Sequence, residues 1–134
     1  MARILVIDDN DLVRDYLKRA LEDAGYDVVV AGDGEQGLRR FKERAVDLVI
    51  CDVLMPNKDG LETVREIRSV TGTLPIITMN GGPVVDQTVL DQGEIDYLRM
   101  ALAFGATRAI AKPFRPAELI ALVQSCLAAE ARPS

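Results

Sequence analysis

The chain has 134 residues, 49% of them apolar, and a formal net charge of −5. This length suits one domain with a substantial core, and the acidic balance disfavours nucleic acid or an anionic membrane as the main partner. The absence of histidine excludes Ser–His and Cys–His triads and histidine-ligated metals within the chain.

Short apolar runs alternate with longer amphipathic patterns along the sequence. Apolar, β-branched runs of this length predict strands, and apolar positions at a spacing of three or four predict helices. In chain order we predict strand 3–8, helix 11–25, strand 27–31, helix 34–44, strand 46–52, helix 61–70, strand 74–80, helix 93–105, strand 107–112 and helix 116–130.

Five successive β–α units predict a parallel sheet with helices on both faces. We therefore expect a flavodoxin-like, doubly wound α/β fold with strand order 2-1-3-4-5. Residues 1–130 would form the domain and 131–134 a frayed tail, while the long connection 81–92 is a candidate functional segment.

Two helices give more specific expectations about packing. In helix 11–25 we expect one buried apolar stripe, and in helix 34–44 Gly37 should cost about 1 kcal/mol relative to alanine. The stripe comprises Leu12, Val13, Tyr16, Leu17, Ala20, Leu21 and Ala24.

The sequence gives no sign of export or of a disulfide framework. No apolar run approaches the length of a membrane span, and the N-terminus lacks the apolar region of a signal peptide, so we expect a cytoplasmic protein. Cys51 and Cys126 have no zinc-site spacing and are expected to be buried apolar residues.

Polar residues follow the predicted strands at one edge of the sheet. Ligands of doubly wound folds bind at this carboxyl edge, where the strand order reverses. Strands 1 and 3 deliver three carboxylates there, and strands 4 and 5 add an amide and an ammonium group. The residues are Asp8, Asp9, Asp52, Asn80 and Lys112.

Such a cluster of carboxylates needs a cation or a change in protonation. Two like charges about 4 Å apart repel by roughly 4 kcal/mol at an effective dielectric constant of about 20. Lys112 can offset one charge, and Mg²⁺ can offset more while it binds a phosphate oxygen. Asp52 could then attack phosphorus and form an aspartyl phosphate.

Structural interpretations of several of these residues remain open at this point. Asp9 or Asp11 could cap the helix that begins near Leu12. Asp59-Gly60 is interpreted as a turn and helix start, and Gly81-Gly82-Pro83 as a loop that permits backbone movement rather than a phosphate cradle.

The sequence resembles the receiver domain of two-component response regulators over essentially its whole length. The resemblance rests on motifs spaced through the five β–α units. They are Asp8-Asp9, Asp52, Met55-Pro56, Asp59-Gly60 and Lys112-Pro113-Phe114.

The resemblance implies a phosphorylation site and a metal site. Asp52 would accept a phosphoryl group from a histidine kinase or phosphotransfer protein, and Lys112, before a cis Pro113, would contact it. The metal would be Mg²⁺, held by Asp8, Asp9, Asp52 and the backbone carbonyl of Leu54. Phosphorylation would shift the strand 4–helix 4–strand 5 face between two states, and this change would signal to a downstream protein target.

Two departures from the family pattern fall on this switching machinery. Asn80 stands where the family usually has Ser or Thr, and Ala109 stands where it often has an aromatic residue. Thr78 lies about 6.6 Å deeper in the same strand, too far to replace that hydroxyl without a strand shift. We therefore expect phosphoryl acceptance, with the strand 4–helix 4 loop as the moving part.

The family resemblance implies a signalling domain rather than an enzyme, and no output module follows in the sequence. We expect a stand-alone receiver that acts through protein contacts or a phosphorelay. The alternative is a receiver-fold adaptor that works without phosphorylation. A phosphatase is disfavoured because Leu54 stands where a general acid is needed, and a flavodoxin-like cofactor binder because residues 8–11, DDND, would repel phosphate.

Overall fold

The computed structural model describes residues 2–52, 60–80, 105–111 and 114–131, without the side chains of residues 80, 111, 130 and 131. The elements, in order, are β1 (Arg3–Ile7), α1 (Asp11–Asp23), β2 (Asp27–Ala31), α2 (Gly34–Glu43), β3 (Leu48–Asp52), α3 (Gly60–Val70), β4 (Ile76–Asn80), β5 (Arg108–Ala111) and α5 (Pro116–Ala131). Their bounds agree with the predicted elements to within two residues. The predicted helix 93–105 lies almost wholly outside the described residues.

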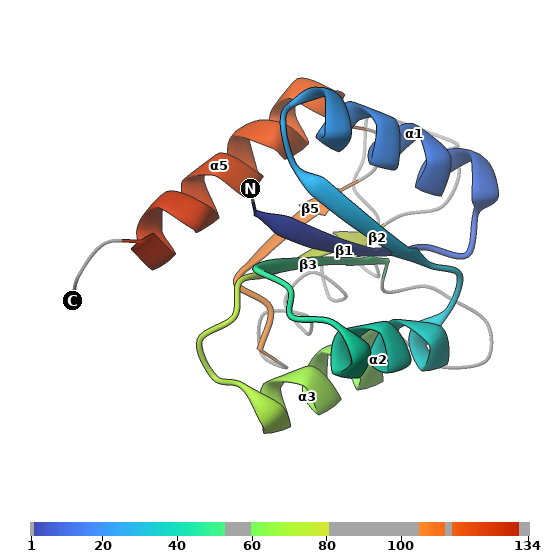
Figure 1. Ribbon diagram of the computed structural model, residues 1–134, viewed down its shortest axis with the longest axis vertical. Coiled ribbons are helices and arrows are strands. Elements are labelled where there is room, and N and C mark those ends of the chain that lie inside the picture. The colour runs from blue at the N-terminus through green and yellow to red at the C-terminus, as the bar shows by residue number, and fades with distance from the viewer. Residues whose placement is uncertain (1, 53–59, 81–104, 112–113, 132–134) are drawn as a thin grey trace, which may run out of the picture.

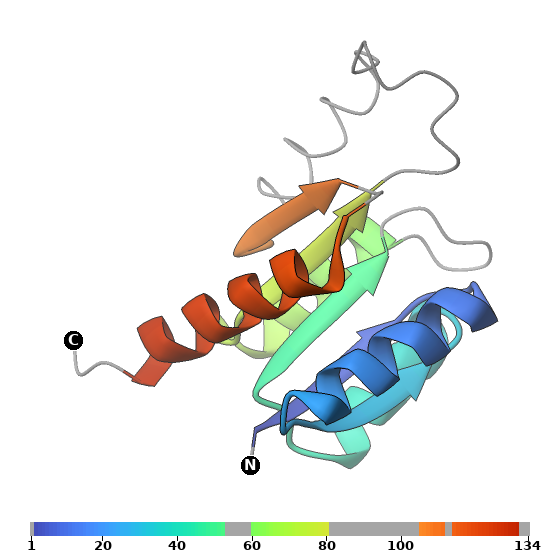
Figure 2. The same ribbon diagram turned by 90° about the horizontal axis from the view of Figure 1, so that it is seen from above.

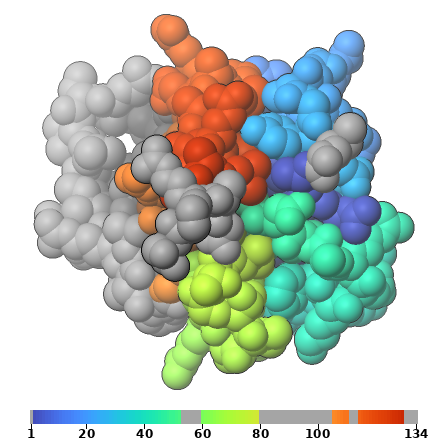
Figure 3. Space-filling model, turned by 60° about the vertical axis from the view of Figure 1, so that its left-hand side comes forward, coloured from blue at the N-terminus to red at the C-terminus, as the bar shows by residue number. Residues whose placement is uncertain are grey.

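All the strand pairs are parallel, and the strand order is β2-β1-β3-β4-β5. The predicted flavodoxin-like topology is thus confirmed. Helices α1 and α5 cover one face of the sheet, and α2 and α3 cover the other (Figure 1). Seen from the amino end of the strands, α1 lies beside α5 and α2 beside α3 (Figure 3).

Apolar strands form a core on each face of the sheet. Every residue of β3 is buried, as expected for a central strand covered on both sides. Residues at alternate strand positions point to opposite faces. The face under α1 and α5 is built from Ile4, Val6, Leu48, Ile50, Ile77 and Met79. The face above α2 and α3 is built from Leu5, Ile7, Val49, Cys51 and Ile76.

The predicted apolar stripe of α1 is wrong at three positions. Leu17 and Leu21 are buried and Val13 packs against their core cluster, whereas Leu12 is 82% and Tyr16 57% exposed, and Ala24 is also exposed. Residues four apart lie on one helix face, and each preceding residue lies about 100° around the axis. Leu12 and Tyr16 therefore form a separate, outward-facing pair.

Gly37 is explained by the close packing of α2 on β1. A Cβ atom at this position would collide with the Ile7 side chain, approaching its Cγ1 to 2.9 Å, and Ile7 is fully buried. Glycine therefore lets the helix approach the sheet at a cost in helix propensity.

We expect Gly37→Ala to destabilise the protein by about 1 kcal/mol, because overpacking of about 1–3 kcal/mol exceeds the gain in helix propensity of about 1 kcal/mol. Urea unfolding would measure the change in the free energy of unfolding. The loss should shrink in an Ile7→Val background, which removes the Cδ1 atom. A stabilising Gly37→Ala substitution would contradict this packing explanation.

The cysteines agree with their predicted structural role. Cys51 and Cys126 are free and buried. Burial raises the pKa of the Cys126 thiol, which disfavours the reactive thiolate. Within the described ranges, no helix combines the length and apolar composition that a membrane crossing requires.

Candidate metal centre

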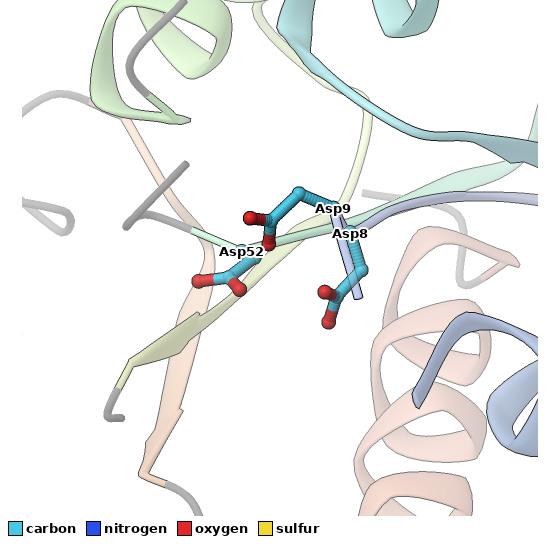
Figure 4. A group of neighbouring side chains, drawn as sticks. All are labelled: Asp8, Asp9 and Asp52. Atoms are coloured by element: carbon cyan, nitrogen blue, oxygen red, sulfur yellow. The ribbon is translucent and has the colours of Figure 1, made fainter. Parts of the chain in front are cut away.

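Three carboxylates meet at the carboxyl end of the sheet. Asp8 and Asp9 follow β1, and Asp52 ends β3, the strand that pairs with β1. One carboxylate oxygen from each lies within 4.8 Å of the others (Figure 4). The carboxyl ends of the strands share one edge of the sheet (Figure 2), so the predicted convergence of these residues is confirmed.

Backbone hydrogen bonds hold Asp8 in place at the end of β1. Its N–H donates to the Ala31 carbonyl at 3.1 Å, and its carboxylate accepts from the Asn10 N–H at 2.9 Å. The residue is fully buried, whereas Asp9 is exposed. The cluster is therefore fixed on its inner side and reachable from solvent on the side of Asp9.

The helix-capping alternative for Asp9 and Asp11 is wrong. The N-cap of α1 is Asn10, whose side-chain oxygen accepts from the backbone N–H groups of Leu12 and Val13. Asn10 is among the preferred N-cap residues, and it stands immediately before the first helical residue. Asp11 instead forms an ion pair with Arg14 in the first turn.

Asp52 is positioned by the central strand of the sheet. It is 5% exposed and lies in register with Met79 of β4. The thiol of Cys51 donates to the Asp52 carbonyl at 3.3 Å, within a fully buried strand end. The backbone from which this carboxylate projects is therefore fixed by the sheet.

The donor set fits a hard divalent cation. Mg²⁺ takes oxygen ligands at about 2.0–2.1 Å in an octahedron, so opposite ligands lie about 4.2 Å apart. Only one pair among three ligands can be opposite, and adjacent ligands lie about 2.9 Å apart. The three oxygens, within 4.8 Å of one another, would therefore have to draw closer around the ion. A cation would also relieve the repulsion among three neighbouring carboxylates.

The remaining predicted site residues are only partly described. The backbone of Asn80 ends β4 in register with Ala111, so it reaches the same edge as Asp52. The described residues do not include Leu54, Asp59, residues 81–83 or Lys112. Their proposed roles stay predictions.

Thr78 is an unusual polar residue beneath this site. Its side chain is fully buried, and its hydroxyl oxygen has no hydrogen-bond partner within the described ranges. The sheet register places it between Cys51 and Ala109. Alanine offers no polar side-chain atom, so the hydroxyl carries an uncompensated desolvation cost.

Thr78→Val should stabilise the protein by about 1 kcal/mol, because valine has nearly the same shape and no buried hydroxyl. Thr107→Val is the contrasting variant, since its Oγ1 accepts from the Ile76 N–H at 3.0 Å and from Arg68 at 3.2 Å. That variant should lose stability. Denaturant unfolding would measure the free energy of unfolding of both variants. A destabilised Thr78→Val protein would show that the Thr78 hydroxyl has a hydrogen-bond partner in solution.

A doubly wound sheet of this order, with three carboxylates where the strand order reverses, defines the receiver class of signalling domain. The family model described as the response regulator receiver domain matches residues 4–124. The chain therefore belongs to the response regulator receiver domain family of two-component systems, as predicted. Phosphorylation and Mg²⁺ binding are typical of this family, whose members interact with histidine kinases and downstream effectors.

Individual relatives support this assignment. The chain is 39% identical over 127 residues to "Response regulator MprA" of a Mycobacterium species, covering 93% of this chain and 50% of that protein. It thus spans about half the length of the curated relatives it matches.

Solved structures are similar over nearly the full chain. A receiver domain protein from Clostridium thermocellum has a TM-score of 0.85 at 30% identity, with 97% of both chains covered. The chemotaxis response regulator CheY4 of Vibrio cholerae has a TM-score of 0.80 at 30% identity, covering 94% of this chain and 98% of that one.

Proposed function

We propose that this chain is a response regulator domain that accepts a phosphoryl group on Asp52 in a Mg²⁺-dependent reaction. The donor would be a histidine kinase or a histidine phosphotransfer protein. The observation that carries the proposal is the meeting of Asp8, Asp9 and Asp52 at the point where the strand order reverses. Residues 1–130 would form the receiver domain and 131–134 a tail, in a cytoplasmic protein.

The chemistry follows from the placement of Asp52. A carboxylate oxygen of Asp52 attacks phosphorus, the P–N bond of the phosphohistidine breaks, and the electron pair returns to the imidazole nitrogen. Burial of the residue and the strand hydrogen bonds of its backbone would restrict the movement of this carboxylate, which would reduce the entropic cost of reaching the transition state. Bound Mg²⁺ would supply positive charge beside the phosphoryl oxygens.

The other site residues would assist the transfer. Asp8 and Asp9 would hold the ion together with Asp52 and the Leu54 backbone carbonyl. Lys112 would offset negative charge on the phosphoryl group, and the Asn80 amide would donate a hydrogen bond to it. The phosphorylated domain would then signal through contacts with a downstream protein or pass the group along a phosphorelay.

Incubation with acetyl phosphate tests this proposal without the unidentified kinase. In the presence of Mg²⁺, intact-mass spectrometry should show one added phosphoryl group, which hydroxylamine removes as expected for an acyl phosphate. Chelation of Mg²⁺ before the reaction should prevent the addition. Failure to incorporate phosphate at saturating Mg²⁺ would instead favour the adaptor that functions without phosphorylation.

A further inference from the structure

Arg14 contacts the turn that carries two of the proposed metal ligands. It lies in the first turn of α1, and its Nη1 donates to the backbone carbonyl of Asp8 at 2.9 Å. Its Nη2 donates to the Asp11 carboxylate. The guanidinium thus links Asp8, which follows β1, to Asp11, which begins α1.

The Arg14 side chain is far less exposed than three other cations that form ion pairs in the described part of the chain. It is 19% exposed, compared with 36% for Arg3, 41% for Lys18 and 48% for Arg40. Its partner Asp11 is 80% exposed, and an ion pair with such a partner contributes at most about 1 kcal/mol. Surface charge pairing therefore does not account for the inward placement of Arg14.

The loop after β2 packs against the other side of the guanidinium. A Cβ atom on Gly32 would lie 3.3 Å from Nη1 of Arg14, so the glycine allows this close approach. The Gly32 N–H donates to the Gln36 side chain at 3.0 Å, which ties this loop to α2. Arg14 is thus held between the end of β1 and a fixed loop.

The Asp8 carbonyl has a particular place in the site. It belongs to the peptide unit that joins Asp8 to Asp9, and a peptide unit is planar. The hydrogen bond from Arg14 therefore fixes the plane from which Asp9 projects. Since the Asp8 N–H and carboxylate are held by Ala31 and Asn10, the Arg14 bond completes the positioning of this segment.

We infer that Arg14 is a positioning residue for the divalent-cation site: its hydrogen bond to the Asp8 carbonyl orients the Asp8–Asp9 peptide so that both carboxylates face Asp52. This inference rests on the proposed function, because it assumes that the three aspartates bind Mg²⁺. The positive charge alone has the opposite effect, since a cation near the cluster disfavours Mg²⁺ binding. A loss of Mg²⁺ affinity on removal of Arg14 therefore indicates a positioning role, whereas a gain in Mg²⁺ affinity indicates an effect of charge alone.

The test is a calorimetric Mg²⁺ titration of the wild-type chain and of Arg14→Met, which removes the donors and retains a similar apolar stem. We expect the Kd for Mg²⁺ to rise about 10- to 100-fold, as for other residues that orient metal ligands. Arg14→Lys keeps the positive charge and has an ammonium group that can still donate a hydrogen bond, so its Kd for Mg²⁺ should be intermediate. If Arg14→Met fails to fold, the lysine variant carries the test.

Arg3→Met is the matched control. Arg3 also donates to a carboxylate and a backbone carbonyl, those of Asp27 and Ala45, but from the first residue of β1, at the amino end. Its loss should leave the Kd for Mg²⁺ unchanged. Phosphoryl incorporation from acetyl phosphate into Arg14→Met should recover once Mg²⁺ exceeds the new Kd.

The outcomes distinguish this inference from the proposed function. A wild-type chain that binds no Mg²⁺ would overturn both. A wild-type chain that binds Mg²⁺, with Arg14 variants that bind it equally well or more tightly, would overturn only the positioning role.

Discussion

Asp52→Asn is expected to abolish phosphoryl incorporation from acetyl phosphate, even at saturating Mg²⁺. The amide lacks the negative charge and nucleophilicity of the carboxylate, and it is a weaker ligand for a hard cation. The side chain is 5% exposed at the end of a fully buried strand, so a neighbouring carboxylate is not expected to replace it. Intact-mass spectrometry with and without the donor measures the loss.

The same substitution should make the metal-free protein more stable by about 1 kcal/mol, because it removes one of three mutually repelling charges. Asp23→Asn, at the exposed C-terminal end of α1, is the matched control. It should accept a phosphoryl group like the wild type. Incorporation that persists in Asp52→Asn would assign the acceptor to another residue.

Leu17→Ala is expected to lower the free energy of unfolding by about 2–5 kcal/mol. Leu17 is 1% exposed and belongs to the core cluster under α1 and α5, so its truncation loses apolar burial and leaves a cavity. A loss of this size is a large fraction of the about 5–15 kcal/mol that stabilises a domain. Urea unfolding followed by circular dichroism measures it.

Leu12→Ala is the matched control for this prediction. It makes the same chemical change on the same helix, but at a side chain that is 82% exposed. Its effect should stay within about 0.5 kcal/mol. Equal losses at the two positions would mean that Leu12 is buried in solution, either in the domain or in an interface.

The fold could be predicted from the sequence because its strands carry a strong local signal. Strands buried on both faces are continuous apolar runs, such as Leu48–Cys51, and the intervening helices leave only parallel connections. Which side of α1 faces the sheet was less predictable. Two apolar pairs lie on this helix, Leu12 with Tyr16 and Val13 with Leu17, and periodicity alone does not show which pair faces the sheet.

The meeting of Asp8, Asp9 and Asp52 was also predictable, because the ends of neighbouring parallel strands share one edge. The supporting contacts were not. Asn10 could have been recognised as the N-cap from its residue type and position, but the Arg14 bond to the Asp8 carbonyl depends on a side-chain conformation set by the packing of the loop at Gly32.

The Thr78 hydroxyl, which has no hydrogen-bond partner among the described residues, was equally hidden from the sequence. A threonine in an apolar strand is common, and its lack of a described partner depends on the register that sets Ala109 beside it. Such cross-strand neighbours lie about thirty residues apart in the chain and follow from the sheet order rather than from a local pattern.

The most direct test of the metal site is the anomalous diffraction of crystals grown with Mn²⁺ in place of Mg²⁺. One strong anomalous peak is expected at the carboxyl end of the sheet, within coordination distance of carboxylate oxygens of Asp8, Asp9 and Asp52. A crystal with this edge open to solvent and no peak there, or with the ion bound elsewhere while the three side chains point apart, would contradict it.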